Sequence, residues 1–187
     1  MKKFIVTLMC IAALGAFAGC SKANDTPSSS EPEKEPKNYV EILKNAQDEE
    51  TVKYNAIIGK GEDGKPTLVH NPSEITSEQM AGMIDMTLQA MGLSLEDIED
   101  YALSASMMNI KVYGVAIVKP AEGKAEVVQA SLQSFIDAKL KEFESYLVDQ
   151  YEVAKSAQLK TMPTGEIVLV MSEDAESVFA KIEEALK

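Results

Sequence analysis

Two apolar runs that lead directly into a long helical pattern, all within residues 101–156, constrain the fold of this chain most. Residues 101–107 and 110–119 have the composition of strands, and we expect a tight turn near Met108 and Asn109 to join them. From Ala121 to Ser156, apolar side chains recur every three or four residues, which predicts helix. This segment should form the centre of the fold, with the rest of the folded chain packed onto it.

The C-terminal residues repeat the same order of elements. Two further strands are predicted at 158–162 and 166–171, around the turn sequence Pro163–Gly165. Ser172 could cap a last helix, whose apolar stripe runs from Val178 to Leu186. The order from Tyr101 is therefore β-β-α-β-β-α. It predicts an α+β fold with a mainly antiparallel four-stranded sheet and its helices on one face.

The long helical pattern should form two helices rather than one. It is 36 residues long, so an unbroken helix would extend ~54 Å. A compact domain of about 150 residues is only about 40 Å across. We expect a break within Ser145–Asp149, with Tyr146 and Leu147 turned into the core. Asp149 and Glu152 have the spacing of a capping-box variant that would start the second helix.

Helices are also expected before this unit. Asn38–Ala46 has the pattern of a short capped helix, and the apolar patch Tyr54–Ile58 leads into a turn region that ends at Pro66. Thr76–Met91 is a clear helix, because Thr76 with Gln79 fits a capping box and Gly92 follows as a stop.

The N-terminus has the anatomy of an export signal. Lys2 and Lys3 precede an uncharged apolar stretch that is too short to span a membrane. Residues 17–20, Phe-Ala-Gly-Cys, are similar to the bacterial lipobox, in which the cysteine receives acyl chains such as palmitate; an ordinary signal peptide cleaved nearby is the alternative. We therefore predict a lipoprotein signal peptide at 1–19, lipidation of Cys20, a disordered tether at 20–37 and a single α+β domain at 38–187.

Charge and residue usage point away from several functions. The formal net charge is −12, which disfavours a nucleic-acid surface. The two cysteines, Cys10 and Cys20, both lie in the export signal region, and the single histidine, His70, is expected in a surface loop. Cysteine and histidine side chains supply the usual ligands of zinc, and histidine is the usual base in nucleophilic catalysis. The predicted domain has no cysteine and one histidine, so such sites would lack partners. We expect no catalytic residues, no cofactor and no metal site.

Two patterns suggest chemistry and have simpler interpretations. Met80, Met83 and Met86 could bind Cu(I), but Met86 falls off the apolar stripe, so core packing is the favoured role. Carboxylates could act as acid and base in a hydrolase, and the candidates are Glu96, Asp97, Glu99, Asp100, Asp149 and Glu152. A solvated helix end and a helix cap are the simpler explanations for these two groups.

Four segments carry a resemblance to a known family. They are Tyr101–Ser104 with Met107–Asn109, Lys119–Lys124, Tyr146–Glu152 and Leu169–Asp174. Because of these four segments, residues 91–186 resemble a family of bacterial lipoproteins known only as a domain of unknown function, DUF4358. The resemblance implies an exported, lipid-anchored α+β domain of gut-type Gram-positive bacteria, attached to the cell membrane through the lipid on Cys20. It implies no activity.

Three functions remain open at this point. A non-catalytic binding or interaction module of the cell envelope, with an unknown partner or ligand, is the favoured reading. The alternatives are a carboxylate-based envelope hydrolase and a small-ligand carrier that serves a transporter. A deep pocket with converging carboxylates would distinguish them.

The charge argument leads to a direct prediction. Because Lys and Arg are outnumbered 30 to 18 by Asp and Glu, the protein should not bind DNA or RNA at physiological salt. A gel-shift assay at micromolar protein concentration should show no complex, and a salt-dependent shift would contradict the argument.

Overall fold

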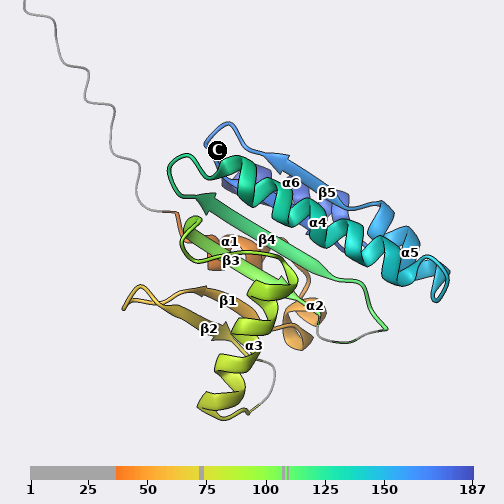
Figure 1. The fold of residues 1–187 in the computed structure, drawn as a ribbon, viewed down its shortest axis with the longest axis horizontal. Helices are drawn as coiled ribbons and strands as arrows, with labels where there is room; N and C mark the ends of the chain where they lie inside the picture. The colour runs from red at the N-terminus through yellow and green to blue at the C-terminus, as the bar shows by residue number, and fades with distance from the viewer. Residues whose placement is uncertain (1–36, 72–73, 107, 109) are drawn as a thin grey trace, which may run out of the picture. The chain divides into compact units, whose positions relative to one another are not determined.

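One antiparallel sheet of six strands organises the part of the chain that the structure describes (Figure 1). The structure is a computed structural model, and it describes residues 37–71, 74–106, 108 and 110–187. The predicted signal peptide, Cys20 and the predicted tether up to residue 36 lie outside the described residues. The strands stand in the order β2-β1-β3-β4-β6-β5, with every neighbouring pair antiparallel. They are β1 Ile57–Lys60, β2 Pro66–His70, β3 Ile98–Ala105, β4 Gly114–Pro120, β5 Gln158–Thr161 and β6 Ile167–Met171.

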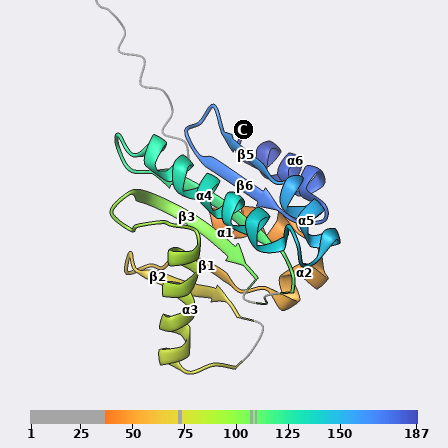
Figure 2. The same cartoon turned by 45° about the vertical axis from the view of Figure 1, so that its right-hand side comes forward.

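Helices cover both faces of the sheet, as Figures 1 and 2 show from two directions. The helices of the described residues are α1 Tyr39–Ala46, α2 Glu49–Tyr54, α3 Ser77–Ala90, α4 Ala125–Phe143, α5 Val148–Lys155 and α6 Ala175–Ala185. One core cluster joins α3, α4 and α5 to one face, and a second joins α1 and α6 to the other. None of these helices has the length and apolar character that crossing a membrane requires.

The prediction of helices on one face was therefore wrong, and strand β4 shows why. Ala116 and Val118 point into the first cluster, whereas Val115 and Ile117 point into the second, and all four are fully buried. The side chains of strand β6 alternate in the same way: Leu169 belongs to the first cluster, and its neighbours Val168 and Val170 belong to the second. Strands that are apolar on both faces need cover on both faces, because each exposed side chain would cost ~1.5–3 kcal/mol.

The prediction of four strands was also wrong, because the hairpin of β1 and β2 adds two. Residues from Gly59 to Pro66 were expected to form a turn region. Gly59 instead belongs to β1 and pairs with Ala102 of β3. A Cβ atom at this position would clash with Cγ2 of Val40, so glycine lets α1 pack closely against the strand. The glycine that suggested a turn is there for close packing.

The connection between β3 and β4 is longer than the tight turn that was predicted. The strands end at Ala105 and resume at Gly114, and the Ser106 N–H donates to the Tyr113 carbonyl at 3.1 Å. The Val112 N–H donates to Oε1 of Gln150 at 2.8 Å, so α5 holds this connection in place. The conformation of this loop therefore depends on a contact with a helix that is distant in the sequence. A local sequence pattern cannot predict such a contact.

The break in the long helical pattern is confirmed, and its details differ. Helix α4 ends at Phe143 and α5 begins at Val148, with Leu147 partly buried against the core as predicted. Tyr146 is 65% exposed rather than turned inward. Leu147 is the N-cap residue, without a side-chain cap, so the predicted capping box at Asp149 was wrong. Backbone geometry at the corner, not side-chain capping, begins α5.

The predicted ends of α3 are confirmed. Thr76 and Gln79 make both hydrogen bonds of a capping box. Gly92 has a φ of 65°, and its N–H and that of Leu93 donate to the Gln89 and Leu88 carbonyls. This is the Schellman arrangement, in which glycine is favoured because other residues are strained at positive φ. Ser172 does not cap α6, whose N-cap residue is Asp174.

Two glycines of this region give a matched test of the backbone argument. Gly92→Ala should lower the free energy of unfolding by about 1 kcal/mol, because alanine is strained at positive φ. Gly82 lies exposed in the middle of α3 with open space around it, so Gly82→Ala should raise the free energy of unfolding by about 0.5–1 kcal/mol. Urea unfolding of both variants measures this, and changes of the same sign would contradict it.

Candidate functional site

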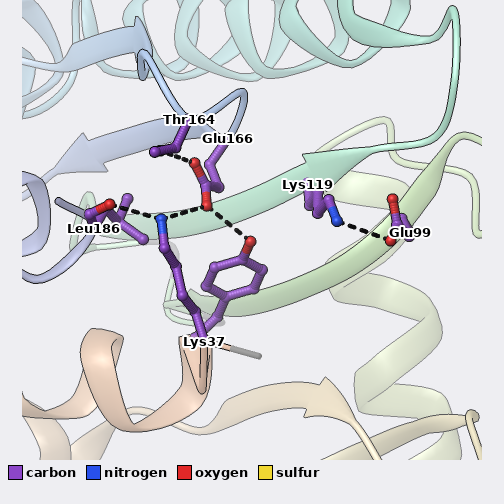
Figure 3. Close-up of polar contacts among 7 residues, drawn as sticks. Lys37, Glu99, Lys119, Thr164, Glu166 and Leu186 are labelled. Atoms are coloured by element: carbon purple, nitrogen blue, oxygen red, sulfur yellow. Dashed lines mark hydrogen bonds and ion pairs between the residues drawn. The ribbon is translucent and has the colours of Figure 1, made fainter. Parts of the chain in front are cut away.

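The carboxylates near the start of β3 are engaged separately rather than gathered around a common centre. Glu99 pairs with Lys119 at 2.9 Å, at the right of Figure 3, and both side chains are about half exposed. Asp97 pairs with Lys124 at 2.7 Å. Asp100 accepts the Tyr101 N–H at 2.8 Å, and Glu96 is exposed. These contacts stabilise the turn before β3 and the pairing of β3 with β4. The solvated helix end suggested for this group was wrong, because Glu99 and Asp100 belong to strand β3 and Glu96 and Asp97 to the turn before it.

The remaining predicted candidates are also dispersed. On α5, Asp149 accepts a hydrogen bond from the Gln150 side chain, and Glu152 pairs with Lys155. Among the methionines, Met80 and Met83 pack against the core while Met86 is 56% exposed, as the helical pattern predicted.

His70 does not lie in a surface loop, so that prediction was wrong. It ends β2, is half-buried, and its buried Nε2 atom has no hydrogen-bond partner among the described residues. Among the described residues, no group of three or more His, Cys, Asp and Glu side chains could hold a metal ion.

A polar hollow of about 400 Å³ opens at the end of the sheet where β4 begins and β6 ends. Its walls come from three places: the end of α1 with one side of α2, the residues from Lys111 to Val115, and the segment from Ser172 into the start of α6. We call it the distal hollow. It brings together residues from 47 to 178, so it exists only in the folded chain.

Acidic side chains dominate the lining of the distal hollow. Four carboxylates face one basic side chain, Lys111; the four are Asp48, Glu50, Glu173 and Asp174. Asp48 is the N-cap of α2, and hydrogen bonds from the Thr51 hydroxyl and backbone N–H hold the pKa of Asp48 below its usual range. The hollow is therefore a region of negative potential, which attracts cations and repels anions.

The wall of the hollow beside α1 contains a buried hydrogen-bond network. The Tyr113 hydroxyl donates to Oε1 of Gln47 and lies 3.3 Å from Oγ of Ser104. Ser104 donates to the Ala56 carbonyl at 2.7 Å. Burial raises the pKa of the Tyr113 hydroxyl above its ordinary value, so the hydroxyl stays protonated. The network fixes this wall in one arrangement.

Ser172 lies on the opposite wall, directly after β6. Its hydroxyl oxygen is buried and makes no hydrogen bond to another described residue. Buried hydroxyls nearly always have a partner, so this Oγ atom is an exception among the described residues.

A buried carboxylate, Glu166, lies at the other end of β6 (Figure 3, left). Lys37 donates to it at 3.0 Å and to the Leu186 carbonyl at 2.6 Å. The Tyr39 hydroxyl and the Thr164 hydroxyl also donate to it. Burial raises the pKa of Glu166, but these hydrogen bonds outweigh burial and leave its pKa below the ordinary value of 4.5. Lys37, the last residue of the predicted tether, is thereby fixed to the domain.

Helices α1 and α6 connect these two ends. The start of α1 lies beside the end of α6, where Lys37 contacts Leu186. Lys181, in the middle of α6, donates to the carbonyl of Ala46 at the end of α1. The end of α1 and the start of α6 both line the distal hollow. The two helices therefore run antiparallel along the sheet, with Lys37 at one end and the hollow at the other.

Local sequence signals pointed to none of the residues that line the hollow as a site. Tyr113 belongs to an apolar run and Asp48 to an acidic stretch, and Ser172 was expected to be a helix cap. A polar residue at the end of an apolar strand, as Ser172 is after Ile167–Met171, is the available signal.

Comparison with known protein families identifies a match over the middle of the chain. A family model described as "Domain of unknown function (DUF4358)" matches residues 73–172, a range that starts and ends earlier than the resemblance inferred from the sequence. No curated protein and no solved structure matches the chain.

The two ion pairs of Figure 3 differ in burial and so should differ in effect. Glu166→Gln should lower the free energy of unfolding by about 2–4 kcal/mol, because it leaves the Lys37 ammonium half-buried without its counter-charge. Glu99→Gln, its exposed counterpart, should cost less than about 1 kcal/mol.

The same pair of variants should differ in pH dependence. Because the pKa of Glu166 is lower in the folded protein than in the unfolded chain, its contribution is fully present above the unfolded value and disappears as pH falls through the folded value. Acidification below pH 4.5 should therefore destabilise the wild type and Glu99→Gln more than Glu166→Gln. Urea unfolding across this range measures the difference, and parallel curves for all three would contradict the assignment.

Proposed function

Because the chain belongs to the DUF4358 family, whose function is unknown, we propose a function from its own geometry: a lipid-anchored, extracytoplasmic protein of the cell envelope whose domain is a non-catalytic binding module. Cys20 would carry the lipid, and residues 21–36 would connect it to the domain at Lys37.

The separation between Lys37 and the distal hollow is the observation that carries this proposal. Lys37 is held by Glu166 at one end of β6, and Ser172 lines the hollow at the other end. A strand rises about 3.3 Å per residue, so the two ends lie roughly 20 Å apart. The tether that carries the lipid would thus join the domain at one end of the sheet. The hollow, at the far end, would stay accessible to a ligand.

Fixed polar groups in the hollow favour binding over catalysis. The Tyr113 hydroxyl is hydrogen-bonded and has a raised pKa, and Asp48 is engaged as a helix cap with a lowered pKa. A general acid or base works best with a pKa near the working pH, and these shifts move both groups away from it. Preorganised polar groups of this kind suit recognition of a ligand.

Lipid attachment is tested by Cys20→Ala. The variant should lose incorporation of labelled fatty acid and leave the membrane fraction or keep its signal peptide, because Cys20 would be the acceptor. Label that persists in Cys20→Ala would contradict the assignment, and Cys10→Ala provides the control for a general loss of export.

The exposure of the hollow on the outside of the cell has a separate test. Apart from Cys10 and Cys20 the chain has no cysteine, so Lys111→Cys introduces a unique thiol at an exposed position beside the hollow. A maleimide reagent that cannot cross membranes should label it in intact cells, with wild-type protein as background. Labelling only after permeabilisation would place the domain inside the cell and refute the proposal.

A further inference from the structure

We propose that the distal hollow binds a basic polypeptide segment, which inserts a lysine or arginine side chain into the hollow and rests apolar side chains on its rim. This inference rests on the proposed binding function and names its partner class. It follows from two features that meet at the same end of the domain, an acidic interior and exposed apolar side chains.

The exposed apolar side chains flank the hollow on the side of α2 and the loop before β4. Tyr54, 59% exposed, lines the hollow itself. Ile110, 57% exposed, directly precedes Lys111, which also lines it. Large apolar side chains that gather on a surface beside polar groups are typical of protein interaction sites.

Two further exposed apolar side chains lie at the corner between α4 and α5. Val148 is 72% exposed and Tyr146 is 65% exposed. The hydrogen bond between Gln150 and the Val112 N–H holds the start of α5 against the loop before β4, so this corner lies at the same end of the sheet. A partner that extends from the hollow past the loop before β4 would reach these side chains on the other side of that loop.

Charge complementarity indicates that the partner is positively charged. The hollow carries the carboxylates of Asp48, Glu50, Glu173 and Asp174 against the single ammonium of Lys111. A basic side chain that enters it gains charge-assisted hydrogen bonds, and arginine could reach two carboxylates at once because its guanidinium is planar with donors on several edges.

Two other occupants fit less well. An anionic membrane surface would be repelled by the acidic hollow, although it could accept the apolar rim. A small organic cation would use the acidic interior and leave Tyr54 and Ile110 without a role. A basic polypeptide with neighbouring apolar residues uses both features.

Fluorescence anisotropy with a labelled synthetic peptide that alternates lysine with leucine and serine tests the proposal on the domain of residues 37–187 attached to its tether. The triple variant Glu50→Gln, Glu173→Gln, Asp174→Asn should weaken binding about tenfold or more, and the wild-type affinity should fall as salt rises. The matched control Glu78→Gln, Asp85→Asn, Glu126→Gln removes the same charge from exposed positions on α3 and α4 and should bind as wild type does.

The rim is tested separately. The double variant Tyr54→Ser, Ile110→Ser should also weaken binding of the peptide by about tenfold, because both apolar contacts are lost. Val69→Ser with Leu95→Ser, two exposed apolar residues that do not line the hollow, is the control and should leave binding unchanged. Circular dichroism of every variant confirms that the domain is folded.

Three results would overturn the inference. The first is equal binding of the peptide to the triple variant and its control. The second is spermidine competing as tightly as the peptide, with no effect of the rim variant, which would identify a small-cation site. The third is no binding to wild type, or preferential binding of a peptide with glutamate in place of lysine. None of these changes the results for Cys20→Ala or Lys111→Cys, so the proposed function stands or falls separately.

Discussion

Burial of β4 and β6 on both faces is the constraint on which the rest of the structure depends. Their side chains alternate between two core clusters, so neither face can be left to water. Helices α4 and α5 follow β4 in the chain and cover one face, while α6 follows β6 and needs a partner for the other. That partner is α1, which comes from the beginning of the domain. The buried pair of Lys37 and Glu166 fixes its start beside the end of α6.

The sequence was sufficient for features that depend on neighbouring residues. The capping box of Thr76, the stop at Gly92 and the break between α4 and α5 each follow from local geometry or from length. The two-faced sheet was also accessible, because Val115–Val118 and Ile167–Met171 are continuous apolar runs rather than alternating ones, a pattern typical of strands covered on both sides. The antiparallel order drew attention to one covered face and hid that signal.

The distal hollow and the Glu166 cluster could not be read in the same way. Lys37 and Glu166 lie 129 positions apart, and Tyr113 meets Gln47 across 66. No local pattern links such residues, because strand register and the antiparallel packing of α1 on α6 bring them together. The lipidation predicted at Cys20 rests instead on a contiguous pattern similar to a lipobox, and it stays a prediction because Cys20 lies outside the described residues.

The family match divides the distal hollow in an informative way. Residues 73–172 include Lys111, Tyr113 and Ser172, which belong to the sheet and the loop before β4. All four carboxylates of the hollow lie outside that range, on α2 and its cap or at the start of α6. Helices α1 and α6, which complete the second face of the sheet, also lie outside it. The matched segment therefore supplies the wall formed by the loop before β4 and Ser172, whereas the segments that flank it supply the other walls and all four carboxylates. The charge of the hollow in this chain must accordingly be argued from residues outside the matched range.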